Sequence, residues 1–282
     1  MFLGGMAMSG VLEVLHHPPT GVARNAAPPL LFVHGAYTGA WCWDAHFLPW
    51  FAERGFDAHA VSLRGHAGSW GRDRLDHFGI HDFVADVAEV AAGLAAPPVI
   101  IGHSFGGFVA QTLARQQSLP AMALLGSVPP YGLSGSLAHM GWSTPHLLWA
   151  LGRHQFSEHP LAMRLPEPDL ALMRELLFSN ALDSDVIRDF AARTQPESLR
   201  ALGELLLPQP WRLWKEPQLP CLVVGVDNDR IISAGDVWLT ARAWHTTPRF
   251  FAETGHALMI DQGWERIATC VAEWLDATFP AA

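Results

Sequence analysis

The chain has 282 residues, half of them apolar, and a formal net charge of −9 at pH 7. That length can bury one sizeable core, and an acidic balance without a basic stripe argues against nucleic acid as a partner. No apolar run reaches the roughly 20 residues that span a bilayer, so no stable membrane insertion is expected.

Three cysteines, Cys42, Cys221 and Cys270, are odd in number and far apart along the chain. They indicate neither a disulfide framework nor a metal site, and they fit a reducing compartment. The opening segment MFLGGMAMSG lacks the cationic start and the long apolar run of a signal peptide. We therefore expect a cytoplasmic protein without a metal, and nothing in the sequence indicates its oligomeric state.

Short β-like runs bounded by glycine and proline recur along the chain. They are residues 11–15, 29–34, 57–63, 98–102, 121–126, 221–226 and 248–253. Several are apolar almost throughout, as the strands of a parallel sheet buried on both faces are. Helix-like segments alternate with them, most clearly at 80–94, 105–117 and 263–279. This alternation predicts an α/β fold with a mostly parallel central sheet flanked by helices.

One interval, 131–218, breaks the alternation. It is roughly ninety residues long without a convincing strand, which is too long for a structureless loop in a compact domain. Its apolar spacing predicts helices instead, with Ser184 as the N-cap of one and Pro196 in the first turn of another. We predict that residues 131–218 form a helical cap inserted into a core of residues 1–130 and 219–282.

A serine stands between glycines where a buried strand gives way to a helix. The segment VIIGHSFGGFVAQ (99–111) contains the pattern G-x-S-x-G around Ser104. Such a turn is sharp, excludes flanking side chains and lifts the hydroxyl clear of the sheet. The following helix also points its first N–H groups at the same place, which would stabilise an anion there. Ser104 is therefore the candidate nucleophile.

A serine needs a base to take its proton, and the base needs an acid to orient it. His256 follows the run 248–253 in a Gly-His turn, which places it at the same edge of the sheet as Ser104. His103 points elsewhere along the sharp turn, and His245 ends a predicted helix away from that edge. The acid comes from the turn after 221–226, which offers both Asp227 and Asp229.

An oxyanion hole needs two N–H donors near the serine. One donor would be the backbone N–H of Phe105, the residue after the nucleophile. The other should come from the loop after an early strand, where Gly35 allows a close turn and Ala36 supplies the N–H. We expect His34 to anchor this loop by hydrogen bonds rather than to transfer protons.

Five segments in this order resemble the α/β-hydrolase superfamily. They are VHGAYTGAWCW (33–43), VSLRGHAGS (61–69), GHSFGG (102–107), GVDNDRII (225–232) and TGHALM (254–259). The first is similar to bacterial lysophospholipase-like serine esterases and to the plant methylesterase and hydroxynitrile lyase group. The resemblance implies the α/β-hydrolase fold, the chain order Ser104, Asp229, His256, and no organic cofactor. It favours Asp229 over Asp227, although the acid turn is one residue longer than the commonest form.

The chain departs from the family pattern in two places. Ser62 and Ala67 replace an aspartate and a glycine in the second segment. We expect little effect on catalysis, because this loop has a mainly structural role. Ala257 stands where the related lyases carry a lysine, which argues against cyanohydrin chemistry. The resemblance thus implies a serine hydrolase of the carboxylesterase type.

The substrate is expected to be a small or medium apolar ester. Aromatic side chains are the candidates for the wall of an apolar pocket. We assign to it, from the sequence, Tyr37, Phe108, Trp142, Trp149 and Trp211. The alternatives are a non-hydrolytic or carbon–carbon bond-cleaving enzyme on the same triad, or a ligand binder without catalysis.

Overall fold

The computed structural model describes residues 10–280 apart from 21, 23–26, 156–166 and 215. The opening segment, on which the expectation of no signal peptide rests, therefore lies almost wholly outside the described residues. Among the described helices, none combines the length and the apolar character that crossing a membrane requires.

Within the described residues, seven strands form one sheet in the order β1-β3-β2-β4-β5-β6-β7. Strand β1 runs antiparallel to β3, and every other neighbouring pair is parallel. The strands are β1 (Val14–His17), β2 (Leu30–Val33), β3 (Ala58–Val61), β4 (Val99–His103), β5 (Met122–Leu125), β6 (Cys221–Val226) and β7 (Arg249–Phe251). The predicted mostly parallel sheet is confirmed, although β1 begins three residues later and ends two residues later than the predicted run 11–15.

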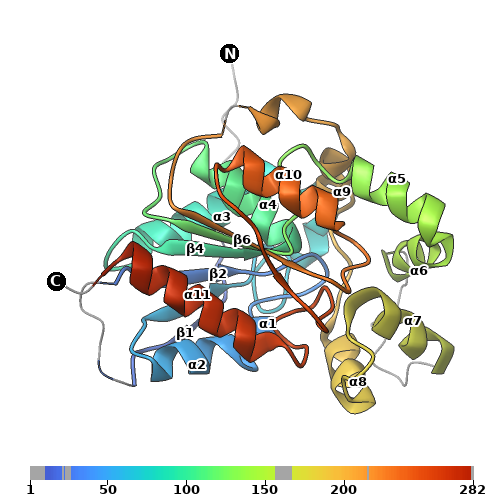
Figure 1. Ribbon diagram of the computed structural model, residues 1–282, viewed down its shortest axis with the longest axis horizontal. Helices are drawn as coiled ribbons and strands as arrows, with labels where there is room; N and C mark the ends of the chain where they lie inside the picture. The colour runs from blue at the N-terminus through green and yellow to red at the C-terminus, as the bar shows by residue number, and fades with distance from the viewer. Residues whose placement is uncertain (1–9, 21, 23–26, 156–166, 215, 281–282) are drawn as a thin grey trace.

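Both faces of the sheet are buried because its central strands are apolar at almost every position. In β2, Leu30 and Phe32 pack into one core cluster, whereas Leu31 and Val33 pack into the other. Helices cover each face, as Figure 1 shows. One face carries α1 (Trp41–Asp44), α2 (Phe47–Glu53) and α11 (Trp264–Thr278), and the other carries α3 (Ile80–Gly93), α4 (Ser104–Ala114) and α10 (Ala234–Ala243).

Five further helices lie between β5 and β6 and gather at one end of the sheet (Figure 1). They are α5 (Ser134–Ser143), α6 (Pro145–Gln155), α7 (Glu167–Leu177), α8 (Ser184–Arg193) and α9 (Leu199–Leu206). We call them the helical insertion. Short 3₁₀ turns, η1 (Arg72–His77) and η2 (Pro210–Leu213), complete the described elements.

Two helix starts in the insertion differ from the prediction. The N-cap of α8 is Asp183, whose side chain accepts a hydrogen bond from the N–H of Asp185, so Ser184 lies inside the first turn. The N-cap of α9 is Ser198, whose hydroxyl accepts from the N–H of Ala201, and Pro196 precedes the helix. At each start the sequence offers two nearby candidates, Asp183 and Ser184 for α8 and Pro196 and Ser198 for α9. The backbone conformation decides where the helix begins.

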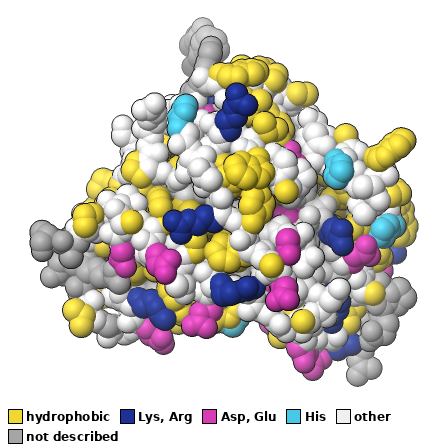
Figure 2. Space-filling model, in the orientation of Figure 1, with side chains coloured by type: hydrophobic (Ala, Val, Ile, Leu, Met, Phe, Trp, Pro, Cys, Tyr) yellow, Lys and Arg dark blue, Asp and Glu magenta, His cyan; other side chains and the backbone are white. Residues whose placement is uncertain are grey.

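The surface carries no single sign of charge on the face drawn in Figure 2. Basic and acidic side chains are interspersed there among scattered hydrophobic ones. This distribution agrees with the overall acidic balance of the sequence.

Candidate active site

Ser104 lies at the junction of β4 and α4. Its φ is +49°, a left-handed conformation that is unfavourable for a non-glycine residue. A Cβ at Gly102 would lie 2.6 Å from the carbonyl oxygen of Gly106, and one at Gly106 would lie 2.3 Å from that of His34. The glycines thus allow strand, helix and neighbouring loop to meet around the turn, which presents the serine hydroxyl at the end of the sheet.

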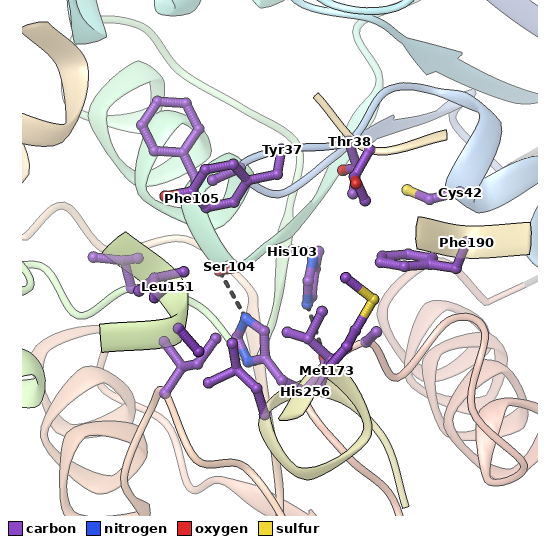
Figure 3. A pocket seen from close by; sticks show the side chains of 18 of the residues that line it. Tyr37, Thr38, Cys42, His103, Ser104, Phe105, Leu151, Met173, Phe190 and His256 are labelled. Carbon is purple, nitrogen blue, oxygen red and sulfur yellow. Dashed lines mark hydrogen bonds between the residues drawn. The ribbon is translucent and has the colours of Figure 1, made fainter. Parts of the chain in front are cut away.

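The structure brings Ser104, His256 and Asp229 together from three separate loops. The Ser104 Oγ lies 2.9 Å from His256 Nε2, and His256 Nδ1 lies 2.7 Å from Asp229 Oδ2. Both distances are those of hydrogen bonds, and Figure 3 shows the serine and the imidazole facing each other. A neutral imidazole with its proton on Nδ1 donates to the carboxylate and accepts the hydroxyl hydrogen at Nε2.

Asp229, not Asp227, is the acid that contacts the imidazole. Its second oxygen, Oδ1, accepts hydrogen bonds from the N–H groups of Ile231 and Ile232, each at 2.8 Å. These bonds fix the carboxylate in the turn after β6. The Asp227 side chain is exposed, and its backbone N–H donates to the carbonyl of Phe251.

His103 supports the site without contacting the serine hydroxyl. Its Nε2 donates to the backbone carbonyl of His256 at 2.9 Å, so it holds the loop that carries the candidate base. Burial, and secondly the neighbouring His256, hold the pKa of His103 well below its ordinary value, which keeps the ring neutral. His245 is exposed beyond the end of α10 and lies outside the site.

The peptide unit between Gly35 and Ala36, in the loop after β2, is held by two side chains. The carbonyl oxygen of Gly35 accepts from His34 Nδ1 at 2.8 Å and from Thr38 Oγ1 at 2.9 Å. Because no cis peptide bond is present among the described residues, the N–H of Ala36 points the opposite way from that carbonyl. Ala36 and Phe105 line the same cavity as Ser104, where the two predicted oxyanion donors are needed.

His34 has the anchoring geometry expected from the sequence. Its Nε2 accepts from the N–H of Leu63 at 3.0 Å, while Nδ1 donates to Gly35. Burial, followed by the nearby His66, lowers the pKa of His34 to about 3. The ring therefore stays neutral at any ordinary pH and takes one fixed tautomer.

A cavity of about 150 Å³ opens above Ser104. Its wall is mainly apolar, and an ion pair between Arg153 and Asp169 (2.8 Å) belongs to the lining as well. Figure 3 shows several of these side chains around the serine and the imidazole. The apolar wall contributed by α6 and α7 consists of Ala150, Leu151, Leu172, Met173, Leu176 and Leu177.

Of the predicted pocket residues, the structure places only Tyr37 on this wall. Trp142, Trp149 and Trp211 expose 91%, 58% and 52% of their surface, so they project into solvent. Phe108 is buried in α4 below the site, with the Arg212 guanidinium 4.9 Å from its ring centre. The assignment of these four was wrong: α6 turns Ala150 and Leu151 rather than Trp149 toward the cavity, and neither α5 nor η2 contributes a described residue to its wall.

A short segment of the insertion, residues 194–198, is fastened to the loops around the site, and we call it the strap. The N–H of Gln195 donates to the carbonyl of Tyr37 at 2.9 Å. The side-chain amide of Gln195 donates to the carbonyl of Gly65 and accepts from the N–H of Ala67, both at 2.9 Å.

The strap also brings a carboxyl group into the interior. The Glu197 carboxylate lies 3.1 Å from His66 Nε2, and both side chains are fully buried. These partners lie 131 residues apart along the chain, so the sequence carried no local signal for the pair.

Comparison with known proteins places the chain in a family. Residues 30–269 match the alpha/beta hydrolase family, and the chain belongs to it. No curated protein sequence matches the chain at a significant level.

Three solved structures illustrate the likeness in fold. A thermophilic esterase from Thermogutta terrifontis is 21% identical, with a TM-score of 0.70 over 98% of this chain and 97% of its own. A putative non-heme bromoperoxidase, BpoC from Mycobacterium tuberculosis H37Rv, is 19% identical, with a TM-score of 0.71 over 99% of both chains. A variant of the N-acyl homoserine lactonase AidH, complexed with N-hexanoyl homoserine lactone, is 17% identical, with a TM-score of 0.71 over 98% of this chain and 97% of its own.

Proposed function

We propose that the protein hydrolyses carboxylic esters of small to medium apolar substrates through an acyl-enzyme on Ser104. The observation that carries this proposal is the continuous hydrogen-bonded series from Ser104 through His256 to Asp229 at the floor of an apolar cavity. Esterases and a lactonase among the proteins of the same fold support an acyl-transfer chemistry.

The reaction follows from the geometry. His256 Nε2 takes the proton of Ser104 as the hydroxyl oxygen attacks the ester carbonyl, and Asp229 stabilises the imidazolium that forms. The N–H groups of Ala36 and Phe105 hold the negative oxygen of the tetrahedral intermediate. The imidazolium then gives its proton to the departing alcohol, and a water activated by the same ring releases the acid.

The substrate class follows from the cavity. Its volume of about 150 Å³ is below the several hundred Å³ typical of sites for drug-sized ligands, and aliphatic side chains from α6 and α7 dominate its wall. An acyl chain of modest length fits this space, and we assign residues 131–218 the part of a substrate-selecting cap.

The decisive experiment combines labelling and turnover. The wild-type chain should react with a fluorophosphonate probe and hydrolyse p-nitrophenyl esters of graded acyl length. Ser104→Ala should lose both, by at least about a thousandfold in kcat, since the nucleophile is gone. Ser143→Ala, an exposed serine on α5, is the matched control and should keep both.

The alternatives give different results in the same experiment. A ligand binder without catalysis would neither react with the probe nor turn over an ester. A non-hydrolytic enzyme on the same triad would take the label at Ser104 but leave every ester intact. Full ester turnover by Ser104→Ala would refute the proposal outright.

A further inference from the structure

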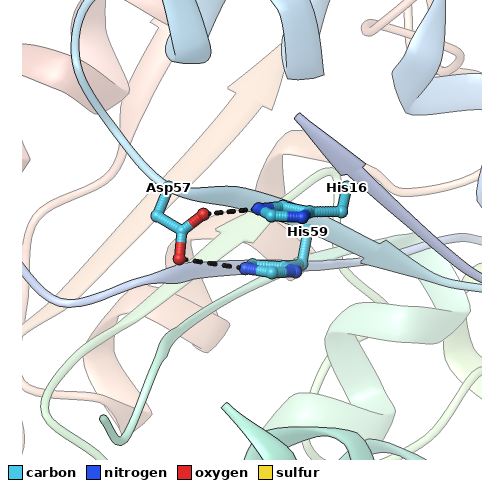
Figure 4. Close-up of side chains that lie close together, drawn as sticks. All are labelled: His16, Asp57 and His59. Atoms are coloured by element: carbon cyan, nitrogen blue, oxygen red, sulfur yellow. Dashed lines mark hydrogen bonds and ion pairs between the residues drawn. The ribbon is translucent and has the colours of Figure 1, made fainter. Parts of the chain in front are cut away.

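Two histidines and an aspartate meet at the edge of the sheet formed by β1 and β3 (Figure 4). His16 and His59 are register partners in this antiparallel pair, and Asp57 immediately precedes β3. The imidazole rings stack with centroids 4.1 Å apart and an interplanar angle of 4°. Asp57 reaches both rings, with Oδ1 2.7 Å from His16 Nε2 and Oδ2 3.1 Å from His59 Nε2.

The carboxylate does not satisfy both rings. His59 Nε2 is buried without an aligned hydrogen-bond partner, although Asp57 Oδ2 lies close to it. The two rings are stacked 4.1 Å apart, which is more than the distance between the two oxygens of one carboxylate. The Asp57 carboxylate therefore cannot lie in the planes of both rings at once. A buried polar atom without a partner is unfavourable, and it points to a ligand.

We propose that His16, Asp57 and His59 bind a divalent ion of the zinc class. Two imidazole nitrogens and a carboxylate oxygen are a ligand set that zinc, nickel and copper prefer, and water would fill the remaining position. The three candidate ligand atoms all lie within 4.8 Å of one another. Ligands of one tetrahedral zinc lie about 3.3 Å apart, so a small tilt of the rings out of their parallel stack completes the site.

The His16 ring is free to make that tilt because it lies on the edge strand with nearly half of its side chain exposed. His59 is held within the sheet and fixes the position of the ion.

The place of the cluster in the fold indicates a structural ion. Asp57 lies at the amino end of β3, whereas Ser104 follows the carboxyl end of β4, so the two sites occupy opposite ends of the parallel strands. An ion here would tie the edge strand β1 to its neighbour. His16 lies 41 residues from Asp57, so no local spacing revealed the cluster, and this proposal replaces the expectation of a chain without a metal.

The test is calorimetric titration of the full chain, freed of metal by a chelator, with Zn²⁺. We expect one ion per chain, an increase in melting temperature with Zn²⁺, and no comparable effect of Mg²⁺, which prefers oxygen ligands. His16→Ala and His59→Ala should each weaken Zn²⁺ binding at least about tenfold and abolish the shift in melting temperature.

His17→Ala is the matched control, because His17 neighbours the cluster but pairs with Asp44 (2.7 Å) instead. It should bind Zn²⁺ as the wild type does. Should His59→Ala fail to fold, the exposed His16→Ala still decides the matter. Absence of stoichiometric Zn²⁺ binding, or binding unchanged in His16→Ala, would overturn the proposal. Ester turnover is not part of the readout, so this result is independent of the proposed function.

Discussion

The hydroxyl of Thr38 offers a direct test of how the loop proposed to supply the Ala36 oxyanion donor is held. It donates one of the two hydrogen bonds to the carbonyl oxygen of Gly35, and His34 donates the other. That carbonyl belongs to the same peptide unit as the N–H of Ala36. In Thr38→Val the side chain keeps its shape but loses its hydrogen-bond donor. The peptide unit between Gly35 and Ala36 then keeps only the hydrogen bond from His34.

The size of the effect can be bounded from these contacts. Complete removal of an oxyanion donor costs about 10²–10³ in kcat. Here the donor remains and only a neutral hydrogen bond worth about 1 kcal/mol is lost, which corresponds to a fall in kcat of about fivefold. KM should stay nearly constant, because the hydroxyl acts on the transition state through Ala36 rather than on the bound ester.

The assay is steady-state hydrolysis of a p-nitrophenyl ester by the wild type, Thr38→Val and Thr38→Ser. The serine variant keeps the hydroxyl and should recover most of the lost kcat. A change confined to KM, or an equal loss in both variants, would show that Thr38 acts through packing and would refute the reasoning.

Two further predictions concern stability and selectivity. Burial lowers the pKa of His34 to about 3, below the 6.5 of an exposed histidine, so protonation favours the unfolded chain. The contribution of the neutral His34 ring to the free energy of unfolding is complete above pH 6.5. As the pH falls toward 3, this contribution decreases by up to about 1.4 kcal/mol per pH unit, which urea unfolding at several pH values measures. His34→Gln should flatten this slope, and an unchanged slope would contradict the assignment. Met173→Trp should fill the cavity wall and reduce kcat/KM for an octanoate ester at least about tenfold more than for an acetate. Equal losses for both esters would place Met173 outside the acyl-binding space.

The fold was predictable from the sequence because buried parallel strands are apolar almost throughout. A single run such as residues 221–226 could also be a piece of buried helix, and the alternation with helical segments favoured a strand. The edge strand β1 was displaced in the prediction because a half-exposed strand lacks the continuous apolar run that marks the central strands. Among the triad candidates, the positions of Ser104 and His256 followed from the strands before them. The choice between Asp227 and Asp229 depended on the path of one turn.

The wall of the cavity was less predictable, for a physical reason. Which side of an inserted helix faces the site depends on how that helix packs, and tryptophan content alone does not decide it. Trp142 and Trp149 were chosen for their size, yet Leu151 and Leu172 line the cavity from the same helical insertion. Pairings between distant parts of the chain, such as the strap with residues 65–67, leave no periodic pattern in the sequence.

The strap joins two loops that lie far apart along the chain. Displacing residues 194–198 would break the three hydrogen bonds of Gln195 and the contact between Glu197 and His66 together. The loop that carries Tyr37 and the loop of residues 65–67 are therefore held with the strap as one unit.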